Sequence, residues 1–363
     1  MYIMALVNQI PYRLLDENAM IPIPQAYLDC AVYIYRTKAD AKTGSLSGGS
    51  GFLTAIPLEI NKEKHKLYVV TARHVIDKMK NPIVRLNLKA GGSEPLETNR
   101  ARWIDHPDGD DLSVYPLPIE PDDDEYQFDG VLPDEFVDRS RNTAIFPGDE
   151  VFMVGRFFSH EGKEKNAPAV RFGNISMMAI ETMEGRYNKR QETYLVEQRS
   201  LPGYSGSPVF VMLDSSQPRP PYWMAPPNRI GKLNIKRSGP WLLGIDWVHI
   251  HSYEPILKKD TTGRMVEVSS RKTWVKAHTG MAGVIPAWRL SDILMSEELK
   301  MGRRKDDERM TQDKKNTTHL TYDSLPKEES DTQTTSAGYE MPIPIRDQVL
   351  SDMGKASRRR NKP

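Results

Sequence analysis

The chain has 363 residues, of which 38% are hydrophobic and 27% charged, which is typical of a soluble globular protein with room for two or three domains. Its 50 basic and 49 acidic side chains leave a net charge of +1, which argues against partners recognised through charge alone, such as nucleic acid or an anionic membrane. No apolar run reaches the roughly 18–20 residues of a membrane span, and no basic segment followed by an apolar stretch opens the chain, so we expect no signal peptide and no membrane partner.

The redox compartment can be inferred from one residue. Cys30 is the single cysteine, so no intrachain disulfide can form. Disulfides are common in secreted proteins and rare in cytosolic ones. We therefore expect a cytoplasmic protein whose fold depends on its hydrophobic core.

Residues 1–27 are predicted to form an irregular N-terminal arm that ends in the segment IPIPQ. From about residue 28 to 295, short runs rich in Val, Ile, Tyr and Phe alternate with Gly, Pro, Asp and Asn, which indicates an all-β barrel or sandwich. Long amphipathic helical patterns are absent between these runs, which argues against an α/β fold. The predicted strands are 30–35, 50–56, 67–72, 83–88, 112–117, 150–157, 194–198, 207–212, 241–247 and 282–287.

Two helices are predicted within this region. A short one follows TAR and contains the segment HVIDKMK. The second covers residues 286–300, where apolar residues recur at the spacing of one helical face. Those residues are Leu290, Ile293, Leu294 and Leu299.

The domain boundaries follow from composition. The acidic stretch 120–136 separates two halves, so we predict a first β-barrel over 28–135 and a second, with the C-terminal helix, over 136–300. Two insertions, 215–240 and 251–274, interrupt the second half. From residue 301 the chain is polar and cannot bury enough apolar surface to offset its entropy, so 301–363 is predicted to be a mostly disordered tail.

The strongest chemical signal is LPGYSGSPVF at 201–210. A serine between glycines, followed by a β-branched run, suits a nucleophile on a loop that leads into a strand, and Ser205 is the candidate. Gly203 allows a backbone conformation closed to other residues. The N–H groups of Gly203 and Ser205 would then form an oxyanion hole. An ordinary Gly/Ser turn is the alternative.

Two further motifs supply a base and an acid. In YVVTARHVID an apolar strand ends in small residues, and His74 then opens a short helix, where a general base could be held rigidly. In HPDGDDLSVYPL, Asp111 directly precedes a short apolar strand and could orient that histidine. Asp110 and Asp108 remain alternatives to Asp111. The chain order His, Asp, Ser is the order that chymotrypsin-type folds use.

At these residues the chain resembles the chymotrypsin-like (PA clan) serine peptidases, and is similar to the disulfide-free bacterial trypsin-like peptidases. SGGSGFLTA resembles the second strand of that family, TARHV its histidine motif, DLSVYPL its aspartate motif, and GYSGSPV its serine motif G-x-S-G-G-P. The likeness covers about 28–295. It implies two antiparallel β-barrels, a His74, Asp111 and Ser205 triad, and peptide hydrolysis through an acyl-enzyme without a cofactor.

The sequence departs from the family pattern at several positions. Tyr204 replaces the aspartate that receives the freed N-terminus in digestive members, so a preformed site is expected, and Ser207 replaces the second glycine. The residue that matches the family's pocket-base position, six before the serine, is Arg199, which could pair with an acidic substrate side chain or point to solvent or a structural carboxylate. Apolar pocket walls are equally consistent with the sequence, and the candidates are Trp247, Val248 and Ala282.

One other pattern could bind a ligand. His249 and His251 share one face of a strand, a spacing found in metal sites, but no third ligand is evident and we expect no metal. The preferred function is a trypsin-like serine protease acting on a protein or peptide substrate, with a regulatory partner. The alternative is a catalytically silent binding module on the same fold.

Overall fold

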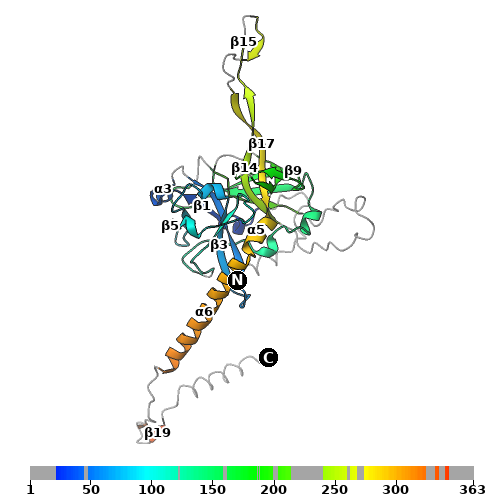
Figure 1. Cartoon of the computed structure of the whole chain (residues 1–363). Helices are drawn as coiled ribbons and strands as arrows, with labels where there is room; N and C mark the ends of the chain where they lie inside the picture. Colours follow the sequence, from blue (N-terminus) through cyan, green and yellow to red (C-terminus); the bar gives the residue numbers. More distant parts are fainter. Residues whose placement is uncertain are drawn as a thin grey trace, which may run out of the picture. The chain divides into compact units, whose positions relative to one another are not determined.

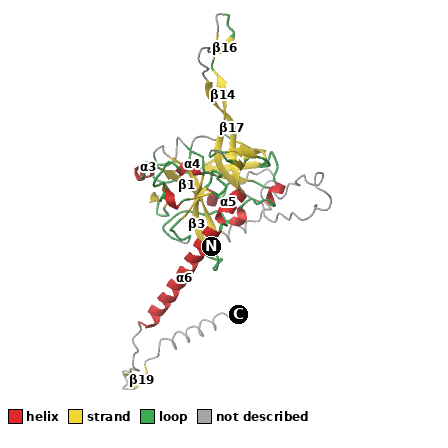
Figure 2. Cartoon of the chain, in the orientation of Figure 1, coloured by secondary structure: helices red, strands yellow, loops and turns green. Residues whose placement is uncertain are grey.

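The structure is a computed structural model. It describes residues 22–44, 48–121, 123–157, 162–185, 187, 189–198, 203–213, 240–259, 262–267, 274–323, 332–334 and 340–342. The chain divides into two compact units, Met1–Lys305 and Asp306–Pro363. Strands are the main type of regular secondary structure in the larger unit (Figure 2).

The N-terminal half of the larger unit is an antiparallel sheet of seven strands in the order β5-β4-β1-β2-β3-β7-β6. Its strands are β1 (Ala31–Tyr35), β2 (Gly48–Pro57), β3 (His65–Thr71), β4 (Ile83–Asn87), β5 (Ser93–Glu97), β6 (Ile104–Asp105) and β7 (Ser113–Pro116). β1 is buried along its whole length. Val32 and Ile34 face one apolar cluster and Tyr33 and Tyr35 another, which explains why its sequence is apolar throughout rather than alternating.

The second half is a closed barrel of six strands in the order β12-β17-β14-β13-β8-β9. Its strands are β8 (Glu150–Gly155), β9 (Ala169–Met177), β12 (Tyr194–Glu197), β13 (Pro208–Val211), β14 (Trp241–Pro255) and β17 (Trp274–Pro286). The predicted all-β fold with two β halves is confirmed. It differs in one respect: within the described residues the first half is not closed by hydrogen bonds, and its last strand, β6, has only two residues.

Short helices connect and cover the strands. They are α2 (Gln25–Asp29), α3 (Lys38–Thr43), α4 (Arg73–Ile76) and the 3₁₀ turns Arg100–Arg102, Pro133–Glu135 and Arg141–Ala144. The short helix predicted after TAR is α4. A further helix, α5 (Ala287–Leu294), follows the last barrel strand.

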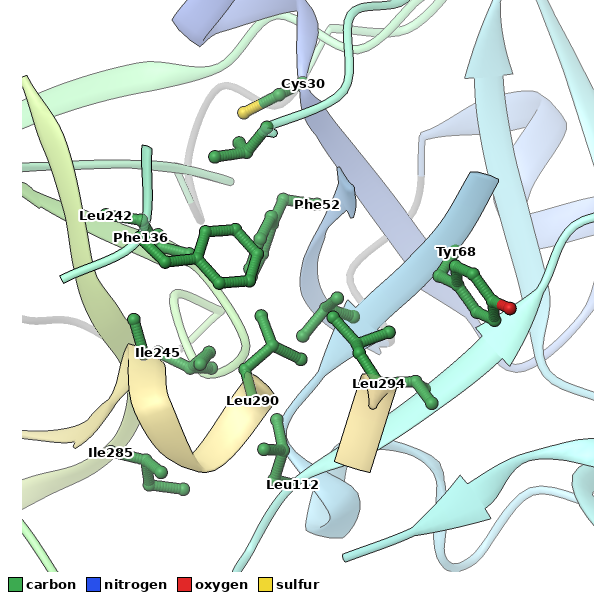
Figure 3. Close-up of a cluster of buried hydrophobic side chains, with 14 of the residues drawn as sticks. Cys30, Phe52, Tyr68, Leu112, Phe136, Leu242, Ile245, Ile285, Leu290 and Leu294 are labelled. Atoms are coloured by element: carbon green, nitrogen blue, oxygen red, sulfur yellow. The ribbon is translucent and has the colours of Figure 1, made fainter. Parts of the chain in front are cut away.

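A central core joins the sheet, the barrel and α5. Figure 3 shows Phe52 of the sheet, Ile245 and Ile285 of the barrel, and Leu290 and Leu294 of α5 converging in this cluster. All five side chains are at most 1% exposed. The apolar face predicted for this helix is therefore buried as expected, and it fixes the two β halves to each other.

A buried arginine ties the connection between β8 and β9 onto the first sheet. Arg85 of β4 is fully buried, and its guanidinium donates to the carbonyls of Ala41, Gly162 and Lys165 at 3.0, 3.0 and 3.3 Å. Its Nε donates to Asn166 Oδ1 at 2.8 Å. Neutral oxygen atoms thus solvate this charge and hold residues 162–166 against the sheet.

Strands β14 and β17 continue beyond the barrel as a two-stranded ribbon, which also carries the small hairpin of β15 (Leu257–Lys259) and β16 (Met265–Glu267) (Figure 1). The insertion predicted at 251–274 contributes to this ribbon, and residues 214–239, with nearly all of the insertion predicted at 215–240, lie outside the described residues. Tyr253 and Trp274 are 65% and 49% exposed on it. Pairing shifts between Asp246 and Val248 and between His249 and His251 mark its base.

Helix α6 spans Glu297–Asp323 and so extends into 301–363, the segment predicted to be a mostly disordered tail. The predicted helix over 286–300 ends with α5 at Leu294, and α6 begins after a short break. Acidic residues in the first turn favour the helix dipole, and ion pairs such as Lys300 with Glu297 lie at i,i+3 spacing. In the smaller unit the structure also describes the hairpin of β18 (Thr332–Thr334) and β19 (Glu340–Pro342).

Arg303 anchors the first turns of α6 within the larger unit. It is 1% exposed, and its guanidinium donates to Glu59 Oε1 at 2.9 Å and to the Leu294 carbonyl at 2.9 Å. It also reaches the hydroxyl of Tyr68 at 3.3 Å. No helix in the described part of the chain is long and apolar enough to cross a membrane.

We predict that Arg303→Leu lowers the free energy of unfolding by about 2–4 kcal/mol, because it leaves a carboxylate and a buried carbonyl without their donor. Arg304→Leu, at the exposed neighbouring position, should change it by less than about 0.5 kcal/mol. Urea denaturation of both variants measures the difference. Equal midpoints would show that Arg303 does not stabilise the fold.

Candidate active site

His74 and Asp111 form a hydrogen-bonded pair in the first β half. His74 lies on α4, one-fifth exposed, and its Nδ1 is 2.7 Å from Oδ2 of the fully buried Asp111. The backbone N–H of His74 also donates to Asp111 Oδ1 at 2.8 Å. An ionised carboxylate only accepts, so Nδ1 is the donor when Asp111 is ionised, and in the neutral ring Nε2 is then the acceptor.

The two alternative aspartates are engaged elsewhere. Asp110 and Asp108 both pair with Arg289 of α5, at 2.6 and 2.7 Å. The bond from Arg289 is the main reason why the pKa of Asp108 lies below its usual value. Of the three candidate acids in this segment, Asp111 is the one whose carboxylate contacts His74.

Ser205 lies in a tight loop, residues 203–207, which we call the serine loop. Gly203 and Gly206 have φ values of +103° and +91°, which only glycine adopts readily. The Ser207 N–H closes a turn onto the Tyr204 carbonyl at 2.8 Å, and Gly206 N–H donates to the Asp246 carbonyl at 2.7 Å. The loop is thereby anchored to strand β14.

Ser50 of β2 joins the serine loop to the other β half. It is fully buried, its N–H donates to the Ser205 carbonyl at 3.0 Å, and its hydroxyl donates to the Gly203 carbonyl at 2.8 Å. The same hydroxyl accepts the N–H of Arg156 at 2.9 Å. Sequence reasoning placed Ser50 in a motif but gave it no role; the SGGSG segment was the only signal.

Two glycines allow the serine loop to approach the helix that carries His74. A β carbon on Gly49 would lie 2.8 Å from Val75 Cγ1 and 3.1 Å from the Ser205 carbonyl oxygen. A β carbon on Gly206 would collide with the Ser50 carbonyl oxygen and lie 3.1 Å from the N–H nitrogen of Ala72. Ala72 and Val75 flank the first turn of α4. The serine loop therefore packs directly against the segment that carries His74.

The structure brings these elements together without completing every contact. Among the described residues, no hydrogen bond joins Ser205 Oγ to His74 Nε2. Within the same residues, the N–H groups of Gly203 and Ser205 donate to no partner. Two unoccupied donors on one loop are what an anionic oxygen would require.

The predicted substrate pocket is only partly represented. Arg199 lies outside the described residues. Trp247 and Ala282 are 2% and 0% exposed, Trp247 in the central core and Ala282 inside the barrel, so neither offers surface to a substrate here. Val248 is half-buried, and the role of these three residues as pocket walls stays a prediction.

The barrel contains two other features that could bind a ligand, a pair of histidines and a cavity. The rings of His249 and His251 are 6.5 Å apart, and the described residues include no cluster of three side chains that could hold a metal ion. A cavity of about 450 Å³ is lined by Arg171, Phe172, Glu197, Gln198 and Gly280. None of its lining residues belongs to the serine loop or to α4.

No protein-family model and no curated protein matches this sequence. Solved structures of protease domains do resemble the fold. The MamO protease domain from Magnetospirillum magneticum is 14% identical, covering 75% of this chain and 98% of that one, with a TM-score of 0.39.

The inactive form of the Rv3671c protease is 14% identical, covering 76% of this chain and 96% of that one, with a TM-score of 0.39. The HtrA-type protease AlgW, solved with a decapeptide, is 12% identical, covering 73% and 63%, with a TM-score of 0.37. Each likeness is distant, and none of these proteins lends a residue role to this chain.

The close approach at Gly206 can be tested against a matched glycine. We predict that Gly206→Ala lowers the unfolding free energy at least about 2 kcal/mol more than Gly148→Ala does. Gly148 has a similar φ of +95° but has open space around its Cβ position, so both variants share the left-handed strain and only Gly206→Ala adds the collision. Thermal unfolding of the two variants measures it; equal losses would mean that the loop relaxes freely.

Proposed function

We propose that this chain is a serine endopeptidase in which Ser205 is the nucleophile, His74 the general base and Asp111 the residue that orients the base. One observation carries the proposal: His74 Nδ1 lies 2.7 Å from Oδ2 of the buried Asp111, and the serine loop packs against the helix that carries His74. A fixed imidazole, next to a loop that carries a half-buried serine and two N–H groups without a partner among the described residues, suits acyl transfer.

The proposed reaction follows from this arrangement. Ser205 Oγ attacks the peptide carbonyl while His74 Nε2 takes its proton, and His74 then protonates the leaving amine. Asp111 stabilises the imidazolium that forms between these steps. Water, activated by His74, attacks the resulting acyl-enzyme and releases the second product.

The oxyanion of the tetrahedral intermediate would be bound by the N–H groups of Gly203 and Ser205. Removing one such donor typically costs about 100- to 1000-fold in rate. Ser50 supports this role, because it donates to the carbonyls of the same two residues at 2.8 and 3.0 Å. These two bonds fix the orientation of the loop backbone. Tyr204 is buried in the barrel and carries no carboxylate for an ammonium group, which favours a site formed without cleavage of the chain.

The missing contact between Ser205 Oγ and His74 Nε2 is compatible with catalysis. Nucleophile–base hydrogen bonds are often long in unliganded enzymes and shorten when substrate binds. The same observation favours a second function, a protease-like binding module that holds a peptide without cleaving it. The two functions differ in whether Ser205 is chemically reactive.

A fluorophosphonate probe distinguishes them, because it reacts only with an activated serine. We predict a covalent adduct on Ser205, located by mass spectrometry, that is absent in Ser205→Ala. His74→Ala and Asp111→Asn should react about 10³- to 10⁴-fold more slowly. The matched control is His65→Ala, at the start of β3 and outside the site, which should react at the wild-type rate.

Folded wild-type protein that forms no adduct would overturn the protease proposal and favour the binding module. Equal labelling of wild type and His74→Ala would also overturn it, because the serine would then be reactive without the proposed base. Circular dichroism on each variant confirms that the labelled samples are folded. A peptide library with Ser205→Ala as the control then defines the preferred substrate.

A further inference from the structure

A small hairpin of the second β half lies against the segments that carry His74 and Asp111. It is formed by β10 (Thr182–Glu184) and β11 (Arg190–Glu192), in the connection between β9 and β12, and it belongs to neither the barrel nor the first sheet. Two strands of three residues are not stable alone. This hairpin must therefore be held in place by its contacts with the rest of the molecule.

Gln191 makes the contact nearest to the candidate acid. Its side chain is buried, with the residue 2% exposed, and its Oε1 accepts the backbone N–H of Asp111 at 2.9 Å. On the same segment, Arg73 N–H donates to the Asp111 carbonyl at 3.2 Å. The main chain of Asp111 is thus held on one side by α4 and on the other by the hairpin.

Tyr187 connects the hairpin to the helix of His74. Its hydroxyl donates to Asp77 Oδ2 at 2.5 Å, and the guanidinium of Arg73 lies 4.3 Å from its ring centre. Burial alone would raise the pKa of Asp77, but hydrogen bonds from Tyr187 and Arg100 outweigh burial and lower it, so this carboxylate stays ionised. Arg73 and Asp77 stand at the two ends of the turn that contains His74.

The hairpin is also fixed at its far end. Glu192 accepts the indole N–H of Trp288 on α5 at 2.5 Å, and Arg139 pairs with Glu192 at 3.0 Å. The neighbouring residue of α5, Arg289, holds Asp110 from the other side at 2.6 Å. The segment that carries Asp111 therefore lies between two anchors, Gln191 and Arg289, which both belong to the C-terminal half.

We infer that Gln191 is a positioning residue for the His74 and Asp111 pair, acting through the Asp111 amide, and that the hairpin holds this pair in the geometry needed for proton transfer. The expected effect of Gln191 on the reaction rate rests on the proposed protease function. Its consequence for His74 itself, however, can be measured without any reaction. Gln191 is not a catalytic residue in this scheme, because nothing in the scheme requires it to touch substrate.

The electrostatic surroundings of His74 determine what each variant should do. The charged and titratable groups around its helix are Asp111, Arg73, Asp77, Arg100, Asp105 and Tyr187. Gln191 is uncharged, so it fixes the position of Asp111 without adding a net charge beside His74. Replacing it with leucine removes the acceptor, whereas replacing it with glutamate keeps the acceptor and adds a negative charge beside Asp111.

The experiment compares Gln191→Leu and Gln191→Glu with the wild type in two measurements. The first is fluorophosphonate labelling, analysed for its maximal rate and for the probe concentration that gives half of that rate. We expect Gln191→Leu to lower the maximal rate about tenfold with the half-saturating concentration unchanged. Glu184→Gln, an exposed change on the same hairpin, is the control and should leave both unchanged.

The second measurement is the pKa of His74 by NMR, in a Ser205→Ala background. We expect Gln191→Glu to raise this pKa by about one unit, because the added charge favours the imidazolium, and to move the acid limb of the labelling profile upward equally. We expect Gln191→Leu to lower the pKa, because a less firmly held Asp111 stabilises the imidazolium less. Gln191→Glu retains the acceptor, so its labelling above that limb should stay near the wild-type rate.

The outcomes separate the two claims. A wild type that is labelled while both Gln191 variants match it in rate and in His74 pKa would overturn the positioning role and leave the protease proposal intact. A wild type that is not labelled overturns the protease proposal, and the NMR shifts then decide the positioning of His74 alone. If Gln191→Leu does not fold, an unchanged His74 pKa together with an unchanged acid limb of the labelling profile in Gln191→Glu would overturn the inference.

Discussion

Ser50 is the point at which the two β halves and the serine loop are hydrogen-bonded to one another. Its N–H and hydroxyl hold the carbonyls of Ser205 and Gly203, and its hydroxyl accepts from Arg156 of the barrel half. Its own carbonyl accepts the hydroxyl of Thr71 at 2.7 Å. Ser50 itself is fully buried, and its bonds with Arg156 and Thr71 are buried from water, where unmade hydrogen bonds are costly. The loop conformation and the packing of the two halves therefore depend on each other.

The candidate residues come from opposite sides of this junction. His74 and Asp111 are held together within the first half by two hydrogen bonds. Ser205 lies on the serine loop, which the Gly206 N–H anchors to the carbonyl of Asp246 in the barrel. The backbone of the serine loop approaches β2 and α4 more closely than a β carbon would allow. Glycine at positions 49 and 206 makes this close approach possible. The packing of the two β halves at the site therefore depends on these two glycines.

Much of this architecture can be read from the sequence, because it follows from apolar runs and turn residues. Strands such as 31–35 and 83–87 were predictable from Val, Ile and Tyr alone, and the apolar face of α5 from its spacing. The pairing of His74 with Asp111 was predictable from motif order. The choice of Asp111 over Asp110 came from its place before a strand, and Arg289, 179 residues away from Asp110, gives the physical reason.

The sequence does not reveal the role of polar residues whose partners are distant along the chain. Gln191 lies 80 residues from Asp111, and Arg303 lies 244 residues from Glu59, so no local pattern distinguishes either from a surface residue. Helix α6 was missed for a related reason: it has no apolar stripe, and its order comes from charge spacing and from the buried Arg303. The burial of Trp247 could not be read either, because it depends on which core the side chain enters.

The ribbon of β14 and β17 has a geometric consequence. Asp246, whose carbonyl anchors the serine loop, lies on the same continuous strand as Tyr253 near the exposed end. The pairing of the two strands shifts register next to Asp246 and next to His249, and such irregularities bend a strand locally. The direction in which the ribbon leaves the barrel is therefore set beside the residue that anchors the serine loop.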